Sequence, residues 1–179
     1  ALAKLLALDA IPEHIAAVDN AHLGGKQMVA AITYAGWQGA EKDYYRRYKL
    51  DGIAGSITEG DDYAAMQQAL TRRLKRVKSG EAVAPDILIV DGGKGQLNMA
   101  RGVLNDLSVT NIILLGVAKG TTRKAGLETL FLETSDNPLP LDPASPALHL
   151  IQHIRDESHR FAIAGGRRGM VSRARAGMM

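Results

Sequence analysis

The fold is decided by the stretch Ile87-Leu88-Ile89-Val90-Asp91-Gly92-Gly93-Lys94-Gly95-Gln96. Its first four residues are apolar and favour β-structure, so they predict a short strand buried on both faces. Two glycines after Asp91 permit a tight turn, and a helical pattern follows with apolar positions at Leu97, Ala100, Leu104 and Leu107. Reactive groups in open α/β sheets gather at the carboxyl ends of strands. Asp91 and Lys94 are therefore candidates for metal-assisted phosphate chemistry, and the alternative is that Asp91 only caps the helix.

Length and composition indicate one globular domain. The chain has 179 residues, of which 46% are hydrophobic, and this is enough for an ordinary buried core. It contains no cysteine, which excludes disulfides and thiolate metal sites and fits a reducing compartment. No apolar run reaches the roughly 20 residues that a membrane span requires, so we expect no membrane partner.

Basic residues are concentrated in two segments, although the formal net charge is only +3. Residues 71–78 include five bases, and residues 165–179 include four arginines and no acid. Clusters of this kind are typical of proteins that bind polyanions such as nucleic acids. They also occur on solvated helix faces and in tails, so both interpretations stay open on the sequence alone.

The order of the expected elements predicts a mixed α/β fold. Strands over 15–18, 29–34 and 43–50 are separated by short glycine turns and predict an antiparallel meander, with Tyr44, Arg46, Tyr48 and Leu50 on one face of the third strand. Further strands are expected over 87–90, 112–117 and 127–132, the last at an edge, and further helices over 61–78 and 145–164. We expect a linker helix over residues 1–12, one domain over 13–164 and a flexible basic tail over 165–179.

Three histidines lie in the last expected helix. At 100° per residue, His149 and His153 fall on the side opposite the apolar stripe, with the spacing of a zinc pair but no evident third ligand. His159 falls at the rim of the stripe beside Arg155, where it is either a boundary histidine or a group that faces a site at the sheet edge. The apolar stripe is predicted to comprise Ala147, Leu150, Ile151, Ile154, Phe161 and Ala162.

The chain order of three residues is similar to that of a ribonuclease H-like nuclease. Asp19 ends the first expected strand, Asp91 ends the fourth, and His159 lies on the closing helix. In such a fold the first and fourth strands lie side by side, so their acids can share a divalent ion. Carboxylate oxygens and a neutral imidazole suit Mg²⁺ or Mn²⁺, and such an ion polarises a phosphate and activates water.

Longer motifs along the chain resemble the C-terminal endonuclease domain of the UvrC family, the incision subunits of bacterial nucleotide excision repair. The motifs are decisive through their number and common order. They are Asp19-Asn20-Ala21-His22, Tyr45-Arg46-Arg47-Tyr48, Gly60-Asp61-Asp62-Tyr63-Ala64-Ala65-Met66, Asp91-Gly92-Gly93-Lys94-Gly95-Gln96-Leu97, Gly126-Leu127-Glu128-Thr129-Leu130-Phe131, Ser145-Pro146-Ala147-Leu148-His149 and Gln152-His153-Ile154-Arg155-Asp156-Glu157-Ser158-His159-Arg160-Phe161-Ala162.

The resemblance implies a ribonuclease H-like fold in which Asp19, Asp91 and His159 are metal ligands and catalytic residues, with Asp62 as a further functional acid. It also implies a cytoplasmic bacterial nuclease that acts at the nucleoid during repair. There it makes the 5′ incision in damaged double-stranded DNA that UvrA and UvrB have opened and marked, with UvrB as its partner. Phosphate contacts near the metal are predicted at four bases, each of which could also be an ordinary exposed base: Lys94, Lys119, Arg123 and Lys124.

The chain departs from the family pattern in three places. The residues after Asp19 read Asn20-Ala21-His22-Leu23 instead of Ile-Ser-His-Thr, which keeps the acid but changes its surroundings. The loop 51–58 is longer than the family pattern, and Gly166 stands where a histidine is common. These departures put the DNA contacts of the loop and the tail in question, but not the main site.

Two other classes of function stay open on the sequence alone. The first is a non-catalytic DNA- or protein-docking module on a nuclease-like scaffold, which would bind without needing Asp19, Asp91 or His159. The second is an NTP-using enzyme, suggested by the glycines and Lys94 after a strand. This class ranks last because the Gly-x4-Gly-Lys-Ser/Thr spacing of a P-loop is absent.

Overall fold

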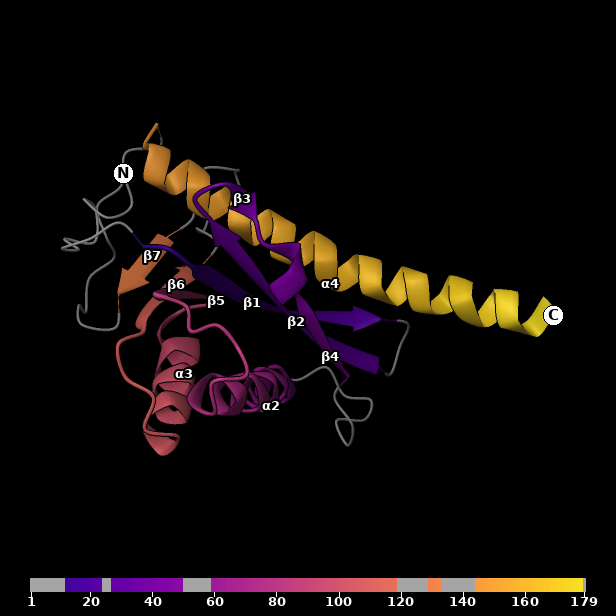
Figure 1. Cartoon of the computed structure of the whole chain (residues 1–179), viewed down its shortest axis with the longest axis horizontal. Helices are drawn as coiled ribbons and strands as arrows, with labels where there is room; N and C mark the ends of the chain where they lie inside the picture. The colour runs from indigo at the N-terminus through magenta and orange to yellow at the C-terminus, as the bar shows by residue number, and fades with distance from the viewer. Residues whose placement is uncertain (1–11, 24–26, 50–58, 119–128, 133–143, 179) are drawn as a thin grey trace.

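A mixed β-sheet with helices on both faces forms the described part of the chain (Figure 1). The computed structural model describes the backbone of residues 12–23, 27–49, 59–118, 129–132 and 144–178, and the side chains of residues 12–20, 29–48, 64–118, 130–132 and 144–164. The strands are β1 (Ile15–Leu23), β2 (Gln27–Gly36), β3 (Gly39–Ala40), β4 (Arg46–Lys49), β5 (Ile87–Asp91), β6 (Ile113–Ala118) and β7 (Thr129–Leu132). The helices are the short 3₁₀ turn η1 (Lys42–Tyr44), α2 (Glu59–Lys78), α3 (Lys94–Asp106) and α4 (Pro146–Met178).

The strand order places β1 next to β5, as the sequence predicts. The sheet runs β3-β2-β1-β5-β6-β7, and β4 also pairs with β2. β1, β2 and β4 pair antiparallel and confirm the expected meander, whereas β1, β5 and β6 are parallel. β7 pairs antiparallel with β6 at the edge, where the sequence places the last strand.

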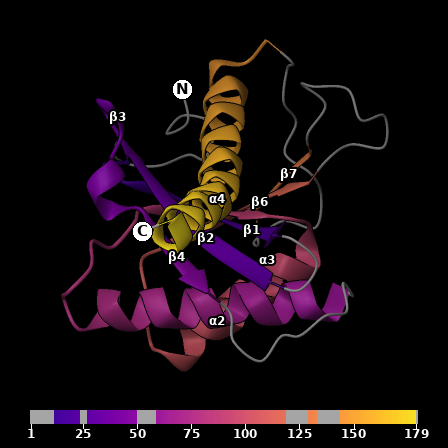
Figure 2. The same cartoon turned by 90° about the vertical axis from the view of Figure 1, so that its right-hand side faces the viewer.

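Successive side chains of the central strands point to opposite faces of the sheet, so apolar residues form one core on each face. On one face Val18, Leu88 and Val90 pack under α2 and α3. On the other face Ala17 and Ile89 pack under the first turns of α4. Figures 1 and 2 show α2 and α3 together on one side of the sheet and α4 alone on the other. Within the described residues no helix is both long and apolar enough to cross a membrane.

The third expected strand is shorter than predicted. Residues 42–44 form a 3₁₀ turn, closed by hydrogen bonds from Tyr44 N to Glu41 O and from Tyr45 N to Lys42 O, and β4 begins only at Arg46. Tyr44 therefore does not belong to the strand face to which the alternation assigned it. A single 3₁₀ turn has no periodicity long enough to be recognised in a sequence. Leu50 lies outside the described residues.

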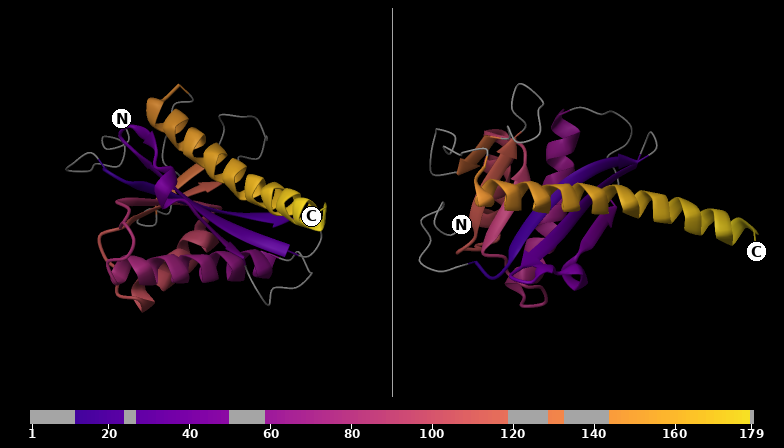
Figure 3. Two further views of the ribbon diagram at one scale, coloured as in Figure 1. Left: turned by 45° about the vertical axis from the view of Figure 1, so that its right-hand side comes forward. Right: turned by 90° about the horizontal axis from the view of Figure 1, so that it is seen from above.

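The last helix differs from the prediction in its length and in one buried position. It was expected to end near Ala164 but continues to Met178 and projects beyond the sheet (Figure 3). Glycine costs only about 1 kcal/mol in a helix relative to alanine, so the glycines after Ala164, with no proline among them, need not end the helix. Leu150 is 40% exposed, and Leu148 is buried in its place, so the apolar stripe is rotated from the predicted one. The linker helix expected over residues 1–12 lies outside the described residues except for Pro12.

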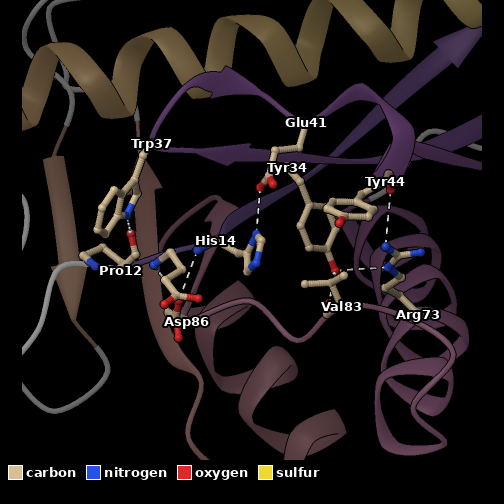
Figure 4. Close-up of polar contacts among 10 residues, drawn as sticks. Pro12, His14, Tyr34, Trp37, Glu41, Tyr44, Arg73, Val83 and Asp86 are labelled. Carbon is tan, nitrogen blue, oxygen red and sulfur yellow. Dashed lines mark hydrogen bonds and ion pairs between the residues drawn. The ribbon is translucent and has the colours of Figure 1, made fainter.

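The amino ends of the central strands are held by polar side chains (Figure 4). Asp86 Oδ2 accepts from the backbone N–H groups of Glu13 and His14, at 2.8 and 3.1 Å. On the same side of the molecule, Arg73 is buried and donates through Nε to the hydroxyl of Tyr34 at 3.2 Å. The Tyr34 hydroxyl in turn donates to Val83 O at 2.8 Å. These bonds tie the segment before β1 to the segment before β5, and the end of β2 to α2 and to Val83.

Candidate active site

Two aspartates lie on neighbouring parallel strands, on the face that α4 covers. β1 and β5 pair with Val18 opposite Val90, so Asp19 and Asp91 follow in register on adjacent strands. Asp19 is 6% exposed, and β1 continues past it to Leu23, so the strand does not end at this acid as predicted. Asp91 is half-buried and is the last residue of β5. The predicted adjacency of the two strands that carry these acids is confirmed, and a metal ion shared by the two acids stays a prediction.

Successive turns of α4 bring one side chain to each aspartate. His159 Nδ1 lies 3.1 Å from Asp19 Oδ2. One turn earlier, Arg155 donates through Nε to Asp91 Oδ1 at 3.2 Å. Residues four apart share one helix face, so α4 presents both groups to the strand ends together. His159 therefore meets Asp19, as a group that faces the site should. A boundary histidine satisfied by this aspartate would make the same contact, so its role as a site residue stays a prediction.

The electrostatics of the site disfavour the charge on Asp19. Burial, reinforced by the nearby charge of Asp91, raises the pKa of the Asp19 carboxyl above its usual range. The contact with His159 and a 2.8 Å hydrogen bond from Asn20 N to Oδ1 oppose this shift but do not cancel it. The fold thus keeps two acids together that repel each other, an arrangement that a cation between them would relieve.

The turn after β5 is held by the backbone N–H groups of its two glycines and by the side chain of Gln96, and not by Asp91. Gly92 has φ +140°, and its N–H donates to Val117 O at 2.8 Å. The helix cap is Gly93, whose N–H donates to the side-chain oxygen of Gln96 at 3.0 Å. The interpretation of Asp91 as a helix cap is therefore wrong, and its carboxylate faces α4. Lys94 is the first residue of α3 and is half-buried just beyond this turn.

A row of residues across three strands supports α4 beside the site. Ala31 lies opposite Asp19 on one side and opposite Arg47 on the other, and all three face α4. Ala162 packs on Ala31, and the Arg47 guanidinium lies 3.7 Å from the centre of the Phe161 ring. Arg47 Nε also donates to Phe161 O at 3.2 Å. The turn of α4 that carries His159 is therefore fixed from below.

Tyr45 also packs against Phe161 and so helps to hold this turn of α4. The two rings meet edge to face with centroids 4.8 Å apart, and Tyr45 is 7% exposed. The Tyr45 hydroxyl lies 3.4 Å from Glu157 Oε1. A side chain packed in this way is not open for stacking on a nucleic-acid base.

The other predicted site residues are placed only in part. Asp62 lies in the first turns of α2, but its side chain is outside the described residues, as are Lys119, Arg123 and Lys124. His149 and His153 are exposed on the outer side of α4, as the helical wheel predicts. Arg155 was not predicted as a site residue. The signal was present, since the same wheel placed it beside His159.

The carboxylates of Asp19 and Asp91 and the imidazole of His159 are suitable ligands for a hard divalent cation, but the two acids contact different partners on α4. Among the side chains that the structure describes, no three His, Asp or Glu groups gather closely enough to hold a metal. Asp19 contacts His159, and Asp91 contacts Arg155. Two carboxylates and an imidazole are nevertheless suitable ligands for Mg²⁺ or Mn²⁺, and the repulsion between the acids favours a cation.

Comparisons with known proteins agree with this arrangement. The family model described as the UvrC RNase H endonuclease domain matches residues 3–163. The UvrABC system protein C of Pseudomonas fluorescens (strain Pf0-1) is 57% identical over 97% of this chain, and that of Chromohalobacter salexigens is 57% identical over 93%. The chain spans only 28% and 27% of the length of these two relatives.

A solved structure supports the fold independently. The crystal structure of human ENDOV aligns with a TM-score of 0.55 over 89% of this chain and 86% of its own, at 14% sequence identity. The ribonuclease H-like fold predicted from the sequence is thus confirmed. By the family match and by its identity to these relatives, the chain belongs to the family of UvrC ribonuclease H endonuclease domains.

Proposed function

We propose that this domain hydrolyses a DNA phosphodiester with the help of Mg²⁺ or Mn²⁺, making the 5′ incision beside a lesion in bacterial nucleotide excision repair. The observation that carries the proposal is that Asp19 and Asp91 follow in register on adjacent strands and that the α4 residue His159 contacts Asp19. Nuclease activity is expected of a UvrC endonuclease domain, and the site holds the residue types that metal-assisted hydrolysis needs.

Each residue of the site has a role that follows from its position. Asp19, Asp91 and His159 would hold the metal ion, which when bound polarises the scissile phosphate and activates water. The N–H of Asn20 fixes one oxygen of Asp19, and burial keeps this carboxylate away from bulk water, which strengthens its attraction for positive charge. Asp62 is proposed as a further functional acid on α2.

DNA would be bound through its phosphates. Lys94 follows Asp91 by three residues and begins α3, so it lies beside the strand end where the reaction is proposed. Lys119, Arg123 and Lys124 are proposed to extend this contact from the segment after β6. Binding through such residues should weaken steeply with salt and show little preference for sequence.

The partners proposed are those of the excision repair system. The relatives are named UvrABC system protein C, and we propose by analogy that the protein acts with UvrB on damaged double-stranded DNA, with UvrA upstream. Its place would be the bacterial cytoplasm, at the nucleoid during repair.

One observation favours a second candidate, a non-catalytic DNA- or protein-docking module. The two carboxylates are paired with His159 and Arg155 and not gathered in one cluster with a third ligand. A docking module would bind its partner whether or not Asp19, Asp91 and His159 were intact. The two candidates therefore differ in whether these three residues are needed for cutting.

The test is an incision assay with Asp19→Asn, Asp91→Asn and His159→Gln in a full-length UvrC protein that carries this domain. We expect each variant to lose the 5′ cut by more than about a hundredfold and to keep the 3′ cut and DNA binding. His153→Gln, on the outer side of the same helix, is the control and should cut normally. Undiminished 5′ cutting by both aspartate variants would leave the docking module as the better account.

A further inference from the structure

Arg155 lies between α4 and the sheet, one helical turn before His159. Its side chain is 15% exposed, and its Nε donates to Asp91 Oδ1 at 3.2 Å. The contact of His159 with Asp19 repeats this pattern on the next turn. α4 thus gives each of the two carboxylates a partner, and the partner of Asp91 carries a permanent positive charge.

The guanidinium of Arg155 and a divalent cation would compete for the same carboxylate, that of Asp91. The guanidinium occupies one of the two oxygens that this carboxylate offers as ligands. A divalent cation held by the same carboxylate would lie close to a fixed positive charge, at a half-buried place where water screens weakly. Asp19 faces no such competition, because its partner is an imidazole, which is itself a metal ligand.

We propose that Arg155 is a resident counter-ion of Asp91, which a divalent cation must displace before the two aspartates act on it together. The inference rests on the metal-dependent function proposed above and adds the residue that sets the affinity for the cation. It also accounts for the two separate pairs that the described side chains form at this site. The counter-ion relieves the repulsion between the acids until the cation takes over that role.

The experiment is a titration of the 179-residue chain with Mn²⁺ by isothermal calorimetry, together with thermal unfolding in the absence of metal. Arg155→Gln keeps a polar side chain and removes the charge. We expect this variant to bind Mn²⁺ about tenfold more tightly than the wild type, because a charge-assisted hydrogen bond no longer competes. Without metal it should unfold at a lower temperature, because Asp91 loses its counter-charge.

Two control variants separate the possible outcomes. Arg160→Gln removes the same charge from the same helix, but Arg160 is an exposed partner of Glu157, so its Mn²⁺ affinity should stay close to that of the wild type. Asp91→Asn should abolish Mn²⁺ binding. If Asp91→Asn binds Mn²⁺ as the wild type does, the proposed metal site itself is wrong.

If Asp91→Asn no longer binds Mn²⁺, the metal site stands, and either of two results would then overturn the counter-ion role of Arg155. One is an Arg155→Gln variant that binds Mn²⁺ no more tightly than the wild type. The other is an equal gain in Arg155→Gln and Arg160→Gln, which would reflect the net charge of the helix and not the contact with Asp91.

Discussion

Asp19 is a residue whose placement opposes the stability of the fold. Its carboxylate is 6% exposed and lies beside the charge of Asp91. Both effects raise its pKa, so the folded state disfavours the ionised form relative to the unfolded chain. A buried acid that lowers the stability of the fold in this way indicates a functional and not a structural role.

Asp19→Asn should therefore abolish cutting without lowering stability. The amide has the shape of the carboxylate and can still bond Asn20 N, but it carries no charge to bury. We expect its free energy of unfolding at pH 7, measured with urea, to equal or exceed that of the wild type. A clear loss of stability would mean that the contact with His159 outweighs burial and repulsion.

Tyr34 is buried at the other end of the strands and affects stability in the opposite sense. Burial raises the pKa of its phenol, and the neutral hydroxyl donates to Val83 O while accepting from Arg73. Because the unfolded chain ionises at its ordinary pKa near 10, stability should be complete below that pH and fall as the pH rises through the higher folded pKa. Tyr45, whose pKa burial raises to about 12, adds to this fall.

Tyr34→Phe should lower the free energy of unfolding at pH 7 by about 1–3 kcal/mol, since it leaves buried Arg73 and Val83 short of a partner. It should also reduce the fall in stability between pH 9 and 11, measured by urea unfolding across that range. The 5′ cut at pH 7 should be unchanged below the unfolding transition. An undiminished alkaline fall would assign the effect to other groups.

At the scale of elements, the turn between β5 and α3 depends on glycine at one position. Gly92→Ala should destabilise the fold by roughly 1–3 kcal/mol, because its φ of +140° strains other residues and an added Cβ would clash with the side chain of Gln96. Gly93→Ala is the matched control, since its φ is −96° and nothing lies within 4 Å of an added Cβ. Equal urea midpoints for the two variants would contradict this account.

The position of α4 over the sheet depends on the contacts of Phe161. Phe161→Leu removes the packing with Tyr45 and the Arg47 contact and should cost about 1–2 kcal/mol. We expect faster hydrogen exchange in residues 155–164 and slower 5′ cutting, while the strands under α2 and α3 keep their protection. His153→Gln should change neither quantity. Uniform loss of protection would show a general destabilisation instead.

At the scale of the whole molecule, the two ends of the sheet have different tasks. The amino ends of β1 and β5 are tied by Asp86 and flanked by the Tyr34–Arg73 bonds, whereas the two acids lie further along these strands, at Asp19 and at the end of β5. None of the residues proposed for chemistry among the described side chains lies at the amino end. This division is why the variants at Tyr34 and Asp19 should separate stability from cutting.

The sequence predicts much of this molecule because many of its signals are local. Apolar runs and glycine turns locate the strands. The adjacency of β1 and β5, which brings their acids together, follows from the resemblance to the ribonuclease H-like fold and not from a local signal. Arg155 could not be assigned to Asp91 in the same way, because a helical wheel gives a face but not the strand beneath it. The burial of Tyr45 likewise depends on Phe161, which is 116 residues away in the chain (161 − 45).

The packing of Ala162 on Ala31 determines how far α4 lies above the sheet. Ala31 is the spacer between Asp19 and Arg47, and Ala162 rests directly on it. A spacer of one methyl group lets the two layers approach closely, and each added methylene would lift the imidazole further from its acid. The small side chain of Ala31 thus sets how closely α4 approaches the sheet, and with it the distance between His159 and Asp19.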